Sequence, residues 1–255
     1  DIYDIVVNQG VKGPLGFVGG VAAFLFGVLT QVLMANQVAT GLALTIFGLG
    51  LSALWGQGYS GESTVPLAKI HIPLLSDIPI IGPLLFSHDP LVYLSIILVA
   101  GVAWFLAKTR AGLILRAVGE SDSAAHAIGY PVLKVRYLAV LFGGAMAGLA
   151  GSYYSLVLTP MWAERLTAGR GWIALALVVF ATWKPERVLL GAYLFGAASI
   201  LHLVLQGLGW NSSTELLAML PYVVTIIVLV LLSWNPARTR LNTPLSIGQP
   251  YRPSK

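Results

Sequence analysis

The chain of 255 residues contains no cysteine and few charged residues. Without cysteine it can form neither a disulfide framework nor a cysteine-based metal or redox site. Only 10% of the residues are charged, whereas 57% are hydrophobic and the mean hydropathy is +0.82. A water-soluble domain of this composition would expose large apolar patches. The lipid bilayer is therefore the expected solvent.

Motifs for nucleotide and nucleic-acid binding are also missing. No Gly-Lys dipeptide occurs, so the chain has no Walker A loop to bind phosphates, and any ATP energy must come from another chain. The net charge is +5, but the basic residues lie in short segments between apolar runs and form no basic face interleaved with aromatics. We expect no nucleic acid, cofactor or metal to bind.

What the chain has in abundance is long apolar runs. Crossing a hydrocarbon core takes roughly 20 helical residues at about 1.5 Å each. No ten-residue strand-like alternation is present, so helices must satisfy the backbone in lipid. The prediction is an all-α, polytopic transmembrane bundle of about seven segments, one of them short or broken. The segments are Gly16–Met34, Val38–Trp55, Leu91–Ala107, Tyr137–Leu158, Gly171–Trp183, Val188–Leu208 and Leu217–Trp234.

The basic residues predict an orientation for these segments. With the C-terminal tail inside, eleven basic residues fall in cytoplasmic segments and four outside, as the positive-inside rule expects. The inside set is Lys108, Arg110, Arg116, Lys134, Arg136, Lys184, Arg187, Arg238, Arg240, Arg252 and Lys255. The outside set is Lys12, Lys69, Arg165 and Arg170.

Three further segments have a predicted character. The chain opens at Asp1 without an initiator Met or a signal-peptide profile, so we interpret it as a fragment truncated at its N-terminus. The outer loop 56–90 has five prolines and two apolar patches that are too short to span a membrane. We expect either a re-entrant or interfacial cap, or an ordered loop that covers helix ends. The basic tail 235–255, which begins Asn235-Pro236, is predicted to be flexible.

The most informative stretch is the predicted cytoplasmic loop 108–136. It contains one expected short helix over Glu120–Gly129, with Glu120, Ser121 and Asp122 as cap and first-turn acids and Gly129 as its stop. A helix of about two turns is marginal alone in water and should pack against something.

This stretch resembles the cytoplasmic signature of ABC permeases in the branched-chain amino acid, ribose and nucleoside importer group. The resemblance rests on Arg116-Ala-Val-Gly-Glu120, Ala124-Ala125, Gly129, Val132 and Arg136, and it continues through Gly143–Gly151 and Ala168–Ala176. The string Gly-Arg-Gly-Trp-Ile-Ala-Leu-Ala is most similar to the nucleoside branch, often labelled simple-sugar permease. The chain departs from the family in having Asp122 where a proline is common, and in lacking the usual first helices.

The resemblance implies that residues 1–234 are the permease domain of a bacterial-type inner-membrane importer, with a nucleoside, a simple sugar or a branched-chain amino acid as solute. It implies four partners: a cytoplasmic ATP-binding subunit, a second permease subunit, an extracytoplasmic solute-binding protein and the lipid bilayer. The short helix would be the coupling helix, seated on the ATPase. The coupling residues are then Arg116, Gly119, Glu120, Ser121, Ala124, Ala125 and Gly129.

Two other classes of function can be set against this one. A secondary transporter would need intramembrane carboxylates, and none lies in the seven segments. An intramembrane serine protease would use the serine of a G-x-S-G motif, here Gly58–Gly61, together with His202. However, Ser60 falls in a Gly-rich outer loop where a turn is favoured.

His202 and Gln206 share a helix face inside a predicted membrane segment. They are either functional residues or form an interhelical hydrogen bond.

The solute path is predicted from broken or short segments, whose free helix ends can face a solute at the membrane midplane. Gly171–Trp183 offers about 13 residues, and Ala35-Asn36-Gln37 interrupts two apolar runs. The alternative is that Asn36 and Gln37 only cap a tight inner turn. The predicted path residues, with Trp172 stacking on a base or sugar, are Asn36, Thr40, Thr45, Gly169, Gly171 and Trp172.

Overall fold

The computed structural model describes residues 14–61, 67–70, 86–167, 169–209, 219, 222–224, 226–227, 230, 243–249 and 251. Most of these residues are helical, and an isolated parallel bridge joins Ser60 to Trp162. The chain divides into two compact units. The first contains residues 1–94, 114–167 and 246–255, and the second contains residues 95–113 and 168–245.

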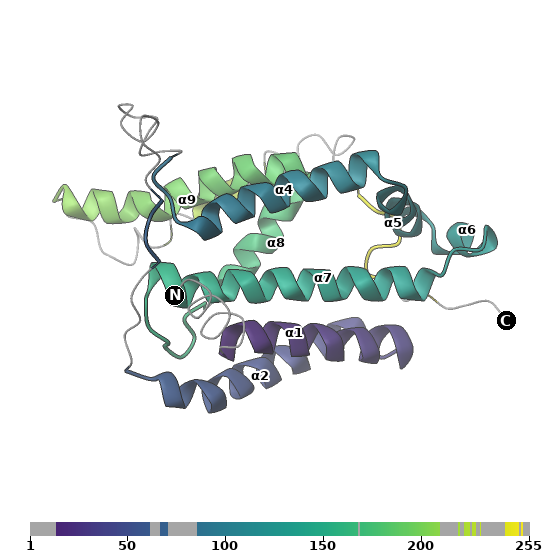
Figure 1. The fold of residues 1–255 in the computed structure, drawn as a ribbon, viewed down its shortest axis with the longest axis horizontal. Helices are drawn as coiled ribbons and strands as arrows, with labels where there is room; N and C mark the ends of the chain where they lie inside the picture. Colours follow the sequence, from purple (N-terminus) through teal and green to yellow (C-terminus); the bar gives the residue numbers. More distant parts are fainter. Residues whose placement is uncertain are drawn as a thin grey trace. The chain divides into compact units, whose positions relative to one another are not determined.

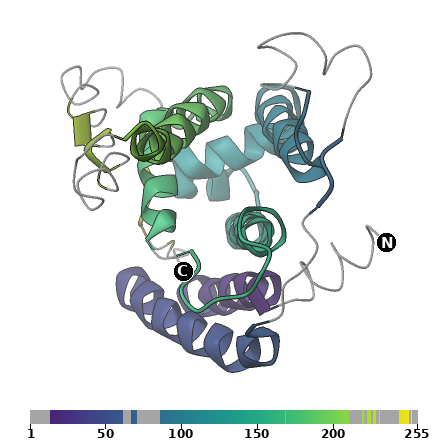
Figure 2. The ribbon, with the colours of Figure 1, turned by 90° about the vertical axis from the view of Figure 1, so that its left-hand side faces the viewer.

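Three long helical stretches build the first unit and lie side by side (Figure 1). In the second view, Figure 2, α1 also lies between α2 and α7. Two of the helices, α1 and α7, continue as single π-helical turns, and α2 ends in a 3-10 turn. The bounds are α1 Pro14–Gly27 with η2 Val28–Val32, α2 Gln37–Gly56 with η3 Gln57–Tyr59, and α7 Val132–Tyr153 with η4 Tyr154–Leu158.

Small residues bring α1 and α7 into backbone contact. An ideal Cβ on Gly19 would lie 2.9 Å from the Cα of Gly148, and one on Gly144 would lie 2.0 Å from the Cβ of Ala23. Lipid tails are as apolar as leucine, so helices in a membrane associate through such close van der Waals packing. Gly144-x-x-x-Gly148 on α7 and Gly19-x-x-x-Ala23 on α1 are thus the small-residue faces that pack together.

The turn between η2 and α2 is closed by Asn36. Its side-chain oxygen accepts hydrogen bonds from the backbone N–H groups of Val38 and Ala39, both at 3.0 Å, which satisfies two of the free donors at the start of α2. Just before it, Met34 adopts a positive φ of 53°. The local geometry therefore matches the alternative in which Asn36 caps a tight turn.

A second close approach fixes the other end of α2. Gly56 is the last residue of α2, and an ideal Cβ there would lie 1.9 Å from the ring of Trp162. Leu67 also reaches this part of the unit, since its N–H donates to the carbonyl of Leu156 at 3.4 Å. Most of the predicted outer loop, residues 62–66 and 71–85, lies outside the described residues, so its re-entrant or interfacial character stays a prediction.

The second unit contains a helical hairpin of α8 (Arg170–Phe180) and α9 (Pro185–Gly207). The predicted short segment is confirmed, because α8 has only 11 residues. Thr182 and Trp183 make the turn with positive φ, and Gly191 on α9 leaves space for the ring of Phe180. The helix α4 (Pro90–Lys108) begins in the first unit and continues into the second.

Three described stretches are long and apolar enough to cross a membrane: Gln37–Tyr59, Pro90–Lys108 and Val132–Leu158. Two shorter apolar helices cover Gly19–Val32 and Arg170–Phe180. They support a helical membrane protein, but the predicted count of seven is not established by them. The last predicted segment, Leu217–Trp234, lies largely outside the described residues, as do the side chains of His202 and Gln206.

The glycine contact between α1 and α7 yields a matched test. Gly144→Ala should lower stability by about 1–3 kcal/mol, because the added methyl overlaps Ala23 and overpacking has costs of this size. Gly143 is the control: no described residue lies within 4 Å of its ideal Cβ, so Gly143→Ala gains helix propensity without a clash. The measurement is the thermal midpoint of the purified chain in detergent. Equal midpoints for the two variants would contradict the packing.

Candidate functional site

The segment between α4 and α7 holds two helices, where the sequence predicted a loop with one. The additional helix is α5 (Arg110–Glu120). Thr109 caps its start, because its hydroxyl oxygen accepts from the N–H of Gly112 at 3.0 Å. Gly112 fits the tight corner after α4, where an ideal Cβ would lie 2.1 Å from the carbonyl oxygen of Phe105. The sequence signal for α5 that was missed is the pair Ile114 and Val118, which are four residues apart and both face the apolar cluster.

The predicted short helix is present as α6 (Asp122–Ala127), six residues long. Its cap is Ser121, whose side-chain oxygen accepts from the N–H of Ala124 at 3.3 Å. Glu120 was predicted to share in this cap, but it ends α5 instead. Gly129 stops the helix with a positive φ of 91°, a conformation that glycine adopts without a Cβ penalty.

One face of α6 is buried and the opposite face is exposed. Ala125 is only 2% exposed and packs with Val118 and Val132 in a small apolar cluster. Ala124, Ala127 and Ile128 are exposed, and the side chain of Ile128 is 70% exposed. Their spacing of i, i+3 and i+4 places these three on one face. The result is an apolar stripe pointing away from the protein, which sequence reasoning missed at Ile128.

The predicted coupling residues therefore divide by position. On α5, Arg116 and Glu120 are exposed and Gly119 is partly buried. Around α6, Ala124 and Gly129 are exposed, Ser121 is engaged in capping and Ala125 is in the cluster. All of them lie in the segment α5–α6 and its exit turn, but only the exposed members could touch a partner directly.

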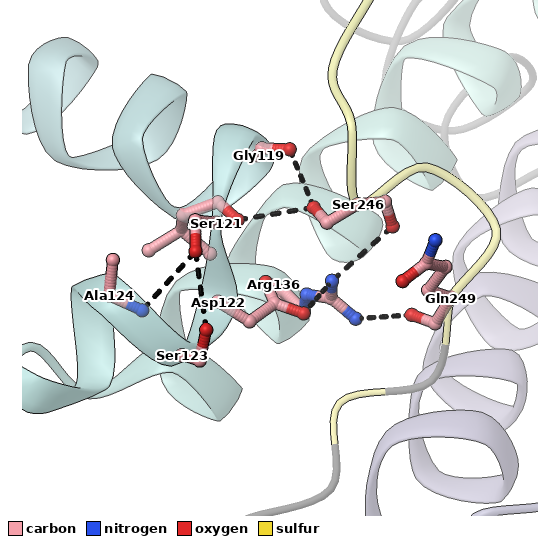
Figure 3. Close-up of polar contacts among 9 residues, drawn as sticks. Gly119, Ser121, Asp122, Ser123, Ala124, Arg136, Ser246 and Gln249 are labelled. Carbon is pink, nitrogen blue, oxygen red and sulfur yellow. Dashed lines mark hydrogen bonds and ion pairs between the residues drawn. The ribbon is translucent and has the colours of Figure 1, made fainter.

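An ion pair ties α6 to α7. Arg136, in the first turns of α7, donates from Nη2 to Oδ2 of Asp122, and both side chains are largely buried (Figure 3). The other carboxylate oxygen, Oδ1, is buried with no hydrogen-bond partner among the described residues. The family departure at Asp122 therefore has a structural role. No local sequence signal could have shown it, since the partners are 14 residues apart.

Part of the tail that the sequence predicted as flexible packs against this segment. The N–H of Ser246 donates to the carbonyl of Gly119 at 3.0 Å. Arg136 donates from Nη1 to the carbonyl of Gln249 at 2.8 Å (Figure 3). Tyr251 is only 7% exposed and belongs to the apolar cluster. Residues 243–249 and 251 thus differ from the expectation, because backbone carbonyls and a buried ring hold them in place.

The predicted solute-path residues lie in both units. In the first unit, Asn36 is a helix cap, Thr40 is buried at 8% exposed, and the hydroxyl of Thr45 donates to the carbonyl of Gly41 at 2.8 Å. Gly169 precedes α8 with a positive φ of 72°, and Trp172 is 72% exposed. Gly171 is exposed beside it. Whether these two groups meet stays a prediction.

The arrangement around Ser60 matches a turn. Ser60 is exposed, follows the short η3 helix and precedes Gly61, which has a positive φ of 86°. Its β-bridge to Trp162 accounts for its place in the fold. The side chain of the proposed partner, His202, lies outside the described residues.

Comparison with known proteins gives one family match and several relatives. Residues 14–229 match the family described as the branched-chain amino acid transport system permease component. A putative glucose ABC transporter permease of Haloferax volcanii is 36% identical, over 93% of this chain and 80% of its own length. A guanosine ABC transporter permease of Bacillus subtilis is 32% identical, over 98% and 82%. A nucleoside ABC transporter permease of Lactococcus lactis is 34% identical, over 84% and 70%.

No solved structure matches the chain. The family resemblance inferred from Arg116–Glu120 and Ala168–Ala176 is confirmed by the match over residues 14–229. Together with the apolar helices, it identifies a multi-pass membrane protein. The chain belongs to the family of permease components of branched-chain amino acid transport systems.

Proposed function

We propose that this chain is the membrane-spanning permease subunit of an ABC importer and moves a nucleoside or a related sugar-containing solute inward. ATP is hydrolysed by a separate cytoplasmic subunit, a second permease chain completes the path, and an extracytoplasmic binding protein delivers the solute. The observation that carries the proposal is the capped helix α6, which presents an exposed apolar stripe at the position of the family's coupling signature.

The solute class is supported by the relatives. These relatives are named as permeases for glucose, for guanosine and for nucleosides. A polyhydroxylated ring is common to these solutes. Since such a ring has an apolar face and polar edges, the exposed ring of Trp172 is a suitable surface for its apolar face.

The docking role of α6 follows from its size and anchoring. A six-residue helix gains little from its own hydrogen bonds and is stable here through its inner face and caps. Its outer stripe, Ala124, Ala127 and Ile128, has no described residue covering it and fits an apolar groove on the ATPase. Arg116 and Glu120 lie on the preceding helix and would contact the rim of that groove, where charges set partner choice.

The membrane orientation supports the same assignment. With the C-terminus in the cytoplasm, the loop 108–136 and the tail 235–255 face the ATPase, and the loop 56–90 faces the binding protein. Residues 1–234 then form the permease domain. Seven membrane segments in this chain are consistent with that arrangement.

The solute path is proposed to pass the start of α8 and the first turns of α2. Trp172 and Thr40 are its central residues. The side-chain oxygen of Asn36 is occupied by capping and the hydroxyl proton of Thr45 by Gly41, which leaves these two less free to bind a solute. Gly169 and Gly171 keep the backbone near Trp172 open.

The docking proposal is tested by reversing the character of the stripe. Ile128→Glu should lower solute-stimulated ATPase and uptake about tenfold or more, because a charge would be buried in an apolar interface. Glu120→Arg should also lower solute-stimulated ATPase and uptake. The control is Leu113→Glu, the same change at an exposed position on α5 outside the stripe. Full coupling in Ile128→Glu proteoliposomes would contradict the assignment.

The orientation is tested with single cysteines, which the native chain lacks. The test uses the variants Lys134→Cys and Glu164→Cys, because both positions are exposed. A membrane-impermeant maleimide should reach residue 134 only from the cytoplasmic side and residue 164 only from the outside, as the charge distribution predicts. Labelling of both positions from one side would overturn the topology.

The solute path is tested by paired substitutions. Trp172→Ala and Thr40→Val should impair uptake roughly tenfold with normal complex assembly and basal ATPase, since a stacking ring or a hydroxyl is lost. Trp172→Phe and Thr40→Ser should recover part of the uptake. Leu190→Ala, an exposed position on α9, is the control. Normal uptake in both test variants would place the path elsewhere.

A further inference from the structure

The last described part of the chain, residues 243–249 and 251, is named here the C-terminal strap. It lies against α5, α6 and α7 (Figure 3). Its polar contacts come from Ser246 and Gln249, and its apolar contact comes from Tyr251. The strap therefore touches every helix of the segment that carries the apolar stripe.

Ser246 completes the end of α5. The last carbonyl groups of a helix have no partner within the helix. The hydroxyl oxygen of Ser246 lies 2.6 Å from the carbonyl oxygen of Gly119 and 3.2 Å from that of Val118. The hydroxyl group therefore donates its proton to one of these two carbonyl oxygens. The backbone N–H of Ser246 also donates to Gly119 at 3.0 Å. The end of α5 is thus capped from a residue 127 positions away.

Arg136 joins the strap to α6. Its guanidinium has five donors in a planar fork and can serve several oxygens at once. It pairs with Asp122 at the start of α6, donates to the carbonyl of Gln249 at 2.8 Å and reaches that of Ser246 at 3.5 Å. Movement of the strap would therefore remove two of the three partners that orient this side chain.

Tyr251 supplies the apolar contact. It is buried with Val118, Ala125 and Val132, one residue from each of the three helices. Its ring lies 5.9 Å from the ring of His126 on α6. The hydroxyl oxygen is buried and has no hydrogen-bond partner among the described residues, so the contribution of Tyr251 comes from its ring.

We propose that the C-terminal strap positions α6 for docking on the ATP-binding subunit, with Ser246 and Tyr251 as positioning residues. The proposal rests on the proposed function of α6 as the coupling helix. The inner face of α6 is held by Ala125, Asp122 and the cluster, and the strap supplies a wall of that cluster. Without the strap, α6 keeps its caps but loses the support that sets the direction of its outer stripe.

The main experiment compares three single variants in the reconstituted importer. Tyr251→Ala should lower the ratio of solute-stimulated to basal ATPase about fivefold or more, a usual size for coupling between two sites, with the same decrease in solute moved per ATP. Tyr251→Phe should keep the native ratio, because the hydroxyl group has no hydrogen-bond partner among the described residues. Leu245→Ala, an exposed strap residue, should also keep it. A native ratio in Tyr251→Ala would overturn the proposal.

A second variant decides the matter if Tyr251→Ala reduces assembly of the complex. Ser246→Ala leaves the ring in place and removes only the hydroxyl cap of α5. It should lower the ATPase ratio in the same direction but to a smaller extent, because the backbone bond to Gly119 remains. An unchanged ratio in an assembled Ser246→Ala complex would overturn the positioning role.

Packing of the strap can be measured directly with a buried cysteine. Val118→Cys should react slowly with maleimide in the full chain and several-fold faster in a chain that ends at residue 242, because Tyr251 then no longer covers it. Lys134→Cys, which is exposed, should react at one rate in both chains. Equal rates at residue 118 in the two chains would mean that the strap does not cover the cluster.

The outcomes separate the two proposals. If Ile128→Glu uncouples and Tyr251→Ala does not, α6 remains the docking element and the strap proposal fails. If Ile128→Glu leaves coupling intact, the docking proposal fails, and an effect of Tyr251→Ala would then have to act outside α6. Loss of coupling in both variants, with native coupling in Tyr251→Phe, supports both proposals.

Discussion

The contact of α1 with α7 through glycine is the constraint on which the first unit depends. In lipid there is no hydrophobic force between helices, so their association needs surfaces that fit closely. Gly19 and Gly144 supply such a surface, and neither position has space for a larger side chain. The position of α7 matters beyond this contact, because its first turns hold Arg136, which pairs with Asp122 of α6, and Val132, which packs in the apolar cluster.

The short helix α6 is packed on one side and exposed on the other. Its inner side has caps, an ion pair with Arg136 of α7, and a small apolar cluster to which α5, α7 and Tyr251 also contribute. Its outer side presents an apolar stripe that a soluble protein would ordinarily cover. A helix of six residues would fray alone, so α6 depends on the contacts of its inner side. Burial of Ala125 and Asp122 supplies that support.

Local patterns in the sequence predicted much of this fold. The long uncharged runs gave the helices α2, α4 and α7 within a few residues, and Ser121 with Gly129 marked α6. The contacts that could not be predicted join distant residues. Asp122 and Arg136 are 14 apart, and Ser246 reaches Gly119 from the tail. Such pairs depend on the tertiary path of the chain, whereas capping and periodicity act within a few residues.

The cap on α5 has a consequence for the order in which the protein is made. Gly119 is separated from Ser246 by 127 positions, and chains are synthesised at about 5–20 residues per second, so the partner of this carbonyl emerges roughly 6–25 s later. All the helices described above precede the strap in the chain. The end of α5 therefore receives this cap only after Ser246 has been synthesised, and a nascent chain that has not reached this residue lacks it.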